Sequence, residues 1–199
     1  NAKDNIDVND GRNVVFGDHG FILVNDAGQW TDIVSTDFTQ GNYDLINTGG
    51  DDDVVVGGLG ADTITAVNGK NLIAGDHAQA TFNAAGFLLA TATLSPVDGA
   101  ADSLTSGIGS DIVLGGAAND DINVSDGRNI VFGDHGEIEF DGLGQWLNVT
   151  TIDVAIGGDD TIQTGNHNDI IFGGFAQDSL TAANGDNTVV GDNGTATFD

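Results

Sequence analysis

The 199-residue chain contains no cysteine, and only four of its residues are Lys or Arg. Without cysteine it can form neither disulfides nor thiolate metal sites, which leaves the cellular compartment open on this criterion. Four basic side chains are too few to bind a phosphate backbone, so neither a nucleic acid nor an anionic membrane is expected as a direct partner. The sequence has no run of 18 apolar residues, and we expect no membrane insertion.

Glutamate is also scarce, because all but two of the 31 acidic residues are Asp. A merely solvated acidic surface would use Glu freely, so the bias indicates that a short carboxylate close to its own backbone in turns is required. The formal net charge is -27. Two carboxylates about 4 Å apart repel by roughly 4 kcal/mol at an effective dielectric constant of about 20. Stacked Asp side chains therefore need a cation between them.

A signal peptide and an initiating Met are absent, and both ends of the sequence fall inside a repeat. We therefore expect the chain to be a section of a longer array. A catalytic set is not evident either. There is no Cys, a single Tyr43, and no Ser with a plausible His and acid partner in a repeated arrangement. Because active sites are singular and this chain duplicates its features, we do not expect an enzyme.

A nine-residue repeat is the dominant feature that is present. The segment from Gly57 to Thr65, GGLGADTIT, fits G-G-x-G-x-D-x-U-x at every position, where U is a large apolar residue. Glycines allow tight turns with positive φ and a close approach of backbone carbonyls to a cation. The last three residues favour a strand whose middle side chain, at position eight, faces inward. Two such half-coils make one coil, so residues 18 apart are expected on neighbouring rungs.

A longer, 58-residue period is overlaid on the first, since GDH-type motifs begin at Gly17, Gly75, Gly133 and Gly191. The first and third copies share a GQW motif that ends at Trp30 and Trp146, which gives a superperiod twice as long. The chain is accordingly divided into the end of a first unit (1–40), a second unit (41–98), a third unit (99–156) and the start of a fourth (157–199).

Because 58 is not a multiple of nine, each unit must contain something besides nonapeptides. The segments NDAG, NAAG and DGLG are turn signals between strand-like stretches, so we expect one β-hairpin per unit. The stretch WTDIVSTDF has a spacing that also suits a short helix. A strand is favoured because the equivalent stretches are rich in Thr and Val.

These motifs resemble the RTX (repeats-in-toxin, hemolysin-type) family, and the tandem 58-residue units are similar to those of giant bacterial surface proteins. The resemblance covers most of each unit. It implies an all-β, right-handed parallel β-roll or β-solenoid with a hairpin insertion in each unit. It also implies several Ca²⁺ ions between stacked turns, held by position-six carboxylates and glycine-turn carbonyls. The ligands so implied are Asp44, Asp53, Asp62, Asp102, Asp111, Asp120, Asp160, Asp169 and Asp178.

Calcium is preferred over magnesium because it accepts six to eight oxygens, including peptide carbonyls, in loose geometry. Other residues of the same column extend the predicted ligand set to Asp4, Asn71, Asn129 and Asn187. Asn contributes oxygen without charge, and Asp51, Ala118 and Ala176 replace the fourth-position glycine, so these sites are expected to be weaker or differently shaped. For a single Asp, a simple turn-forming role remains the alternative.

The aspartates of the GDH-type motifs have two open interpretations. Either they bind the last calcium ion of each stack or they only stabilise the turn. On the first interpretation the predicted ligand set also includes Asp18, Asp76, Asp134 and Asp192. Zinc is not expected at His19, His77 and His135, because no Cys is near and a 58-residue spacing keeps them apart. We expect packed turn histidines instead.

Two further columns lie outside the nonapeptides. Trp30 and Trp146 are interpreted as core packing, in preference to a contact between molecules or a glycan surface. Arg12, Lys70 and Arg128 share one column and are interpreted as a solvated ladder.

The function predicted from these features is mechanical. The chain is expected to be a calcium-binding spacer, stalk or filament-forming section of a large secreted bacterial surface or fibre protein, which folds when it meets calcium outside the cell. Its expected partners are calcium ions, neighbouring repeats and further copies in end-to-end self-assembly. The alternatives are the C-terminal RTX region of a secreted enzyme or toxin, and a ligand-binding adhesin module.

Overall fold

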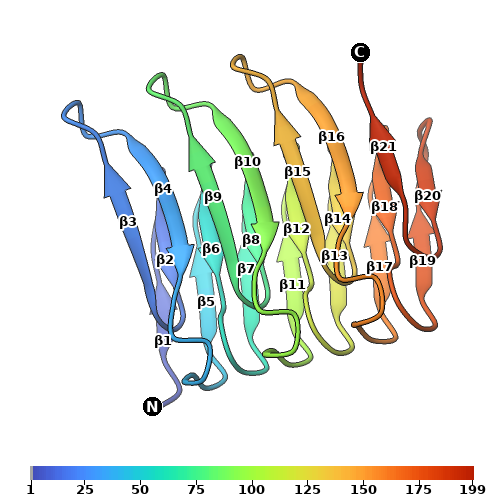
Figure 1. The fold of residues 1–199 in the computed structure, drawn as a ribbon, viewed down its shortest axis with the longest axis horizontal. Coiled ribbons are helices and arrows are strands. Elements are labelled where there is room, and N and C mark those ends of the chain that lie inside the picture. Colours follow the sequence, from blue (N-terminus) through green and yellow to red (C-terminus); the bar gives the residue numbers. More distant parts are fainter. Residues whose placement is uncertain (1) are drawn as a thin grey trace.

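The computed structural model describes residues 2–199, so residue 1, which opens the first predicted repeat unit, lies outside the described part. Within it the chain forms strands and turns without any helix, and hence has no helix that is long and apolar enough to cross a membrane. Figure 1 shows the strands side by side in an array that advances from the N-terminal to the C-terminal end along the long axis. The predicted all-β fold is confirmed.

Two of the three sheets are parallel and form the solenoid. Strands of the first solenoid sheet have alternating exposed and buried residues. In order across the sheet they are β1 (Asn5–Asp7), β5 (Leu45–Thr48), β7 (Thr63–Ala66), β11 (Ser103–Ser106), β13 (Asp121–Val124), β17 (Thr161–Thr164) and β19 (Ser179–Ala182). Those of the second solenoid sheet are β2 (Val14–Phe16), β6 (Val54–Val56), β8 (Leu72–Ala74), β12 (Ile112–Leu114), β14 (Ile130–Phe132), β18 (Ile170–Phe172) and β20 (Thr188–Val190).

The sequence separation between neighbouring rungs of the solenoid alternates between 18 and 40. Ile46 pairs with Ile64 across the shorter step, and Ile64 pairs with Leu104 across the longer one. The two steps together make the 58-residue period. All the described units therefore belong to one continuous stack, in which every second coil carries an insertion.

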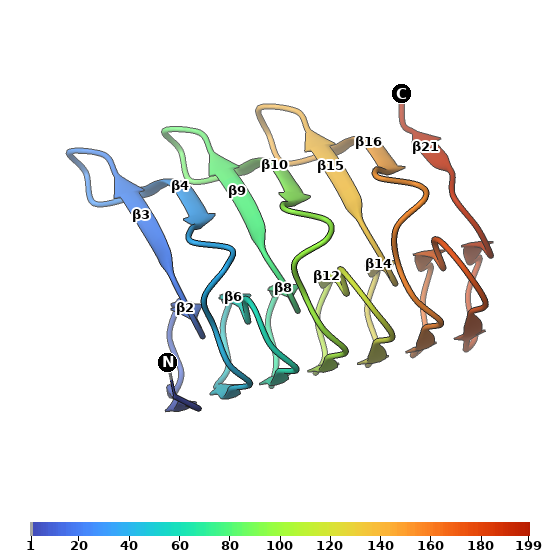
Figure 2. The same cartoon turned by 60° about the horizontal axis from the view of Figure 1, so that its bottom comes forward.

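The insertions are the predicted β-hairpins, and they form a third, antiparallel sheet, here called the hairpin sheet. Its strands in order are β21 (Thr195–Thr197), β16 (Trp146–Thr151), β15 (Gly136–Phe140), β10 (Leu88–Thr93), β9 (Ala78–Phe82), β4 (Trp30–Ser35) and β3 (Gly20–Val24). Figure 2 shows this sheet rising from the solenoid on the side of the second solenoid sheet. The stretch that begins at Trp30 is therefore a strand, as favoured from its sequence.

The hairpin turns have the residue chemistry that their sequences indicate. In the first, Asn25 Oδ1 accepts hydrogen bonds from the backbone N–H groups of Ala27 (2.9 Å) and Gln29 (3.0 Å). Gly28 has a φ of 77°, a left-handed conformation that glycine adopts without steric cost. Asn83 and Asp141 begin the equivalent turns and accept the same pair of hydrogen bonds.

The core consists of two apolar layers, one on each face of the second solenoid sheet. Between the solenoid sheets lie the eighth-position side chains, such as Val55, Ile64 and Ile73, all fully buried as predicted. On the other face, residues such as Phe132 and Phe172, whose rings stack at 5.1 Å, pack under the hairpin sheet. The neighbours of the eighth position face away from the layer between the solenoid sheets, yet in this sheet they are buried, because the hairpin sheet covers them.

Candidate metal centre

The sixth-position residues form two files, one along each edge of the solenoid. At the hairpin edge the chain passes from the second solenoid sheet to the first, and at the short-turn edge it passes from the first to the second. The file of the hairpin edge consists of Asp4, Asp44, Asp62, Asp102, Asp120, Asp160 and Asp178. The file of the short-turn edge consists of Asn13, Asp53, Asn71, Asp111, Asn129, Asp169 and Asn187.

From Asp44 and Asp53 onward, each of these side chains reaches back toward the preceding rung. The backbone N–H of Asp44 donates to Asp62 Oδ1 (2.6 Å), and the N–H of Asp62 donates to Asp102 Oδ1 (2.7 Å). The same bond recurs at every described step of both files. Pairs at a sequence separation of 18 are therefore neighbours, as predicted, and pairs at a separation of 40 are neighbours as well, which the sequence analysis missed.

The second carboxylate oxygen of the aspartates is enclosed and has no hydrogen-bond donor. This holds for Oδ2 of all nine aspartates that the RTX resemblance implies as calcium ligands: Asp44, Asp53, Asp62, Asp102, Asp111, Asp120, Asp160, Asp169 and Asp178. A buried charged oxygen without a partner costs several kcal/mol, on the order of what its desolvation requires. A cation that binds these oxygens removes that cost.

Backbone carbonyls converge on the same oxygens at the hairpin edge. A Cβ atom placed on Gly57 would lie closer than 3.0 Å to both Asp62 Oδ2 and Gly75 O. Equivalent glycines at 17, 75, 115, 133 and 173 have the same surroundings, an Asp Oδ2 and a glycine carbonyl oxygen. Only a residue without a side chain leaves this space open.

The donor set fits Ca²⁺. Within residues 2–199 no three His, Cys, Asp or Glu side chains converge on one point. An ion in these turns would therefore be held by carboxylates together with backbone carbonyls, an all-oxygen set of the kind that calcium accepts. When bound, the ion would supply the positive charge that the stacked carboxylates lack.

Burial raises the pKa of Asp62, Asp102, Asp120 and Asp160 strongly in the metal-free protein. Desolvation is the largest cause for Asp62 and Asp160, whose pKa values rise to about 8. For Asp102 desolvation is joined by repulsion from Asp76, and its pKa rises to about 11. The pKa of Asp120 rises to about 10, again mainly by desolvation. At neutral pH these groups require either a proton or a metal ion.

Three aspartates of the GDH-type motifs, Asp18, Asp76 and Asp134, lie beside the hairpin-edge file but bind backbone amides, and the fourth, Asp192, is exposed. Asp76 accepts hydrogen bonds from the N–H groups of Ala100 (3.1 Å) and Ala117 (2.6 Å), and Asp134 accepts them from Gly158 (2.8 Å) and Phe175. Asp18 accepts one from Leu59 (2.7 Å). These bonds tie the starts of the first three hairpin insertions to the following coil. The geometry gives them this structural role, and their role as calcium ligands stays a prediction.

The histidines are separated, as their spacing requires. His77 and His135 are buried, and His19 is exposed. The ring of His77 lies 4.7 Å from that of Phe38, and His135 Nε2 lies 3.1 Å from the carbonyl oxygen of Pro96. His77 and His135 thus pack against the insertions as predicted, whereas the prediction of a packed histidine is wrong for His19.

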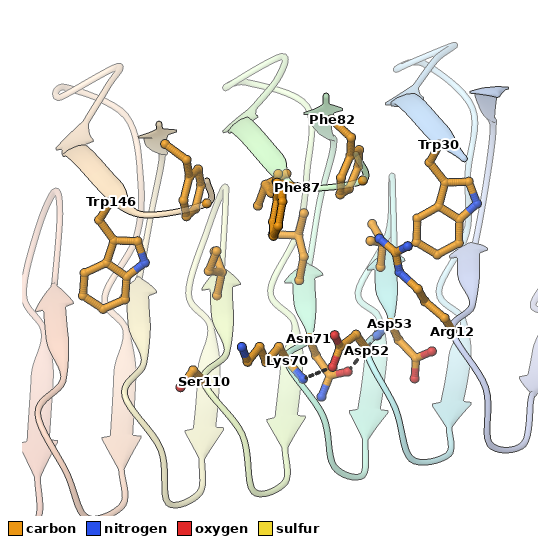
Figure 3. A pocket seen from close by; sticks show the side chains of 17 residues that line it. Arg12, Trp30, Asp52, Asp53, Lys70, Asn71, Phe82, Phe87, Ser110 and Trp146 are labelled. Carbon is orange, nitrogen blue, oxygen red and sulfur yellow. Dashed lines mark hydrogen bonds between the residues drawn. The ribbon is translucent and has the colours of Figure 1, made fainter. Parts of the chain in front are cut away.

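The tryptophans line a groove between the hairpin sheet and the short-turn edge, a cavity of about 500 Å³ (Figure 3). Both are partly buried and pack on the core under the hairpin sheet. The Arg12 guanidinium lies 4.2 Å from the Trp30 ring centre, and that of Arg128 lies 3.7 Å from the Trp146 ring centre. Both arginines are exposed, as the prediction of a solvated ladder requires, but each also lies on an indole face and so links the solenoid to a hairpin.

Comparison with known proteins identifies the family. The family model of the RTX calcium-binding nonapeptide repeat matches four times, at residues 41–76, 98–136, 157–180 and 164–197, which together cover more than half of the chain. The chain belongs to the RTX calcium-binding repeat family. It is a calcium-binding repeat region, and proteins with such repeats are typically secreted by bacteria. No curated protein matches it, and no solved structure does.

Proposed function

We propose that this chain is a calcium-loaded structural section of a large extracellular bacterial protein, and that it serves as a spacer, stalk or filament-forming segment. The observation that carries the proposal is the set of nine buried Oδ2 atoms without a hydrogen-bond donor. They are the proposed calcium ligands, together with the glycine carbonyls beside them. The proposed units remain 1–40, 41–98, 99–156 and 157–199.

A mechanical role is supported by the continuity of the three sheets. Each of them runs through every unit, from the first strands to the last. A load along the axis would be shared by the hydrogen bonds of all three sheets at each rung. The family itself is a structural calcium-binding repeat, and the repetition of every feature supports a structural part over a catalytic one.

End-to-end association is the proposed mode of assembly. Hairpins of successive units already pair with each other in this way, β4 with β9 and β10 with β15. The same pairing of hairpin strands would join a further copy. Calcium would control this assembly, because the strands form only when the turns are loaded.

The test is far-UV circular dichroism with and without a calcium chelator. We expect the strand signal to be lost on chelation and restored by calcium, with magnesium much less effective. A strand signal that chelation leaves unchanged would contradict the proposal. Light scattering of the calcium-loaded chain at increasing concentration then tests assembly separately, since a strictly monomeric folded chain would exclude the filament-forming role alone.

A further inference from the structure

The short-turn file alternates strictly between Asn and Asp, whereas the hairpin-edge file contains only Asp. In both residue types Oδ1 has the same role. The N–H of Asp111 donates to Asn129 Oδ1 (2.9 Å), and the N–H of Asn129 donates to Asp169 Oδ1 (3.0 Å). The remaining atom of each side chain, Nδ2 in Asn and Oδ2 in Asp, therefore occupies the equivalent place inside its own turn.

In the turns of Asn13, Asn129 and Asn187 this atom donates hydrogen bonds to carbonyls of its own turn. Asn129 Nδ2 donates to Ser125 O (3.1 Å) and Gly127 O (3.2 Å). Asn13 Nδ2 donates to the equivalent carbonyls, those of Asn9 (3.1 Å) and Gly11 (2.6 Å). Asn187 Nδ2 makes the first of these two bonds, and Asn71 Nδ2 is enclosed without a partner.

The orientation of these amides is fixed by their surroundings. If the Asn129 amide were turned over, its oxygen would face two carbonyl oxygens and its NH₂ group would face a backbone N–H. The amide nitrogen is a donor only and cannot bind a cation. Asn129 is fully buried, so water does not compete for the turn carbonyls.

In the Asp turns the atom at the same place is an oxygen. Oδ2 of Asp53, Asp111 and Asp169 is enclosed and has no donor in hydrogen-bond geometry. The Ser106 and Thr164 hydroxyls lie near Asp111 and Asp169 but are themselves buried without a partner. In an Asn turn the backbone carbonyls accept hydrogen bonds from the side-chain amide. In an Asp turn the equivalent carbonyls face a carboxylate oxygen instead. Oxygens on both sides require a cation between them.

We propose that the Asn side-chain amide takes the place of the calcium ion in alternate turns of the short-turn edge. Calcium is then held at this edge by the turns that end in Asp53, Asp111 and Asp169, and the turns that end in Asn close without metal. The inference rests on the proposed calcium-binding function. It assigns Asn71, Asn129 and Asn187 a role opposite to the ligand role predicted from sequence, and it makes the short-turn edge less dependent on calcium than the hairpin edge.

The test counts bound ions by native mass spectrometry of the calcium-loaded chain and three variants. Asn129→Asp converts a metal-free turn and is expected to bind one ion more than the wild type. Asp111→Asn is expected to bind one ion fewer and still fold. Asn123→Asp adds the same charge at an exposed position of β13 and is the matched control, with an unchanged count. Unchanged counts in both turn variants would overturn the inference.

A second measurement does not depend on how the variants fold. Anomalous diffraction from calcium-loaded wild-type crystals is expected to locate ions at the Asp turns and none at the Asn turns. An ion within about 2.3–2.6 Å of the Asn129 side chain, the usual calcium–oxygen distance, would overturn the inference. A wild-type chain that binds no calcium would overturn the proposed function and this inference with it. Ions found equally at Asn and Asp turns would leave the function standing and remove only the inference.

Discussion

The backbone N–H of Asp62 donates a 2.7 Å hydrogen bond to Oδ1 of Asp102, a residue 40 positions later in the chain. This bond crosses the rung that carries a hairpin insertion and joins one 58-residue unit to the next. It makes the hairpin-edge file continuous. Loss of a carboxylate here should therefore affect two units rather than one.

Replacement of Asp102 by Ala should destabilise the calcium-loaded fold by about 1–3 kcal/mol, because the buried N–H of Asp62 loses its acceptor. The calcium concentration at the folding midpoint should rise as one ligand is lost. Thermal unfolding in saturating calcium and calcium titration by circular dichroism measure the two effects. Asp121→Ala, an exposed change in β13, is the control. Equal effects of the two variants would contradict the role assigned to Asp102.

The dependence of the fold on calcium should increase with pH. In the metal-free fold the pKa of Asp62 is raised from 3.8 to about 8, chiefly by desolvation. Protonation therefore supports the metal-free fold fully below about pH 4, and this support is lost as the pH rises through about 8. The calcium-free chain is accordingly expected to unfold at neutral pH with its carboxylates ionised, and to regain strands on acidification. Circular dichroism of the chelated chain as a function of pH measures this, and a strand signal that does not rise as the pH falls would contradict the raised pKa values.

Replacement of Gly115 by Ala should destabilise the loaded fold by about 1–3 kcal/mol, since its Cβ would enter the space between Asp120 Oδ2 and Gly133 O. Calcium affinity should fall with it. Gly142, in a hairpin turn, has nothing within 4 Å of its Cβ position. The Gly142→Ala variant should behave like the wild type in calcium-dependent thermal unfolding, and similar losses in both variants would exclude a specific role for the space between Asp120 and Gly133.

Replacement of Arg128 by Ala should cost about 0.5–1 kcal/mol, the typical value of an exposed cation–π contact. Its guanidinium lies on the Trp146 ring, so the emission of Trp146 should change as well. A Trp30→Phe background leaves Trp146 as the one remaining tryptophan. Lys70→Ala is the matched control, because Lys70 holds the equivalent position one unit earlier and lines the same groove. Trp146 emission that responds equally to Arg128→Ala and Lys70→Ala would exclude the stacking of Arg128 on Trp146.

Several features of the fold could be predicted from the sequence because they depend on neighbouring residues. The burial of Ile64 follows from its position in the nonapeptide, and the hairpin turn at Asn25 follows from local turn chemistry. The burial of both faces of the second solenoid sheet was missed. The sequence does contain a signal for this burial. The continuous apolar triplets of β6, β14 and β18 are typical of strands that are covered on both faces.

The fourth position of the nonapeptide shows where a prediction from local sequence fails, because glycine is expected there. Asp51, Ala118 and Ala176 replace glycine there, yet they retain its left-handed conformation, with φ values of 80°, 71° and 82°. Such a conformation costs on the order of 1–3 kcal/mol per residue. The surrounding stack holds these turns in shape, because each is paired with turns above and below it.

The sequence by itself determined the coil, the hairpins and the calcium chemistry, because short-range spacing sets which side chains face inward and which carry oxygen. Only the tertiary structure decided which rungs are neighbours across an insertion, what Asp76 binds, and which atom of Asn129 points into its turn. These depend on the distance between residues that are far apart in sequence and on the direction of a single amide. A periodic pattern contains neither kind of information.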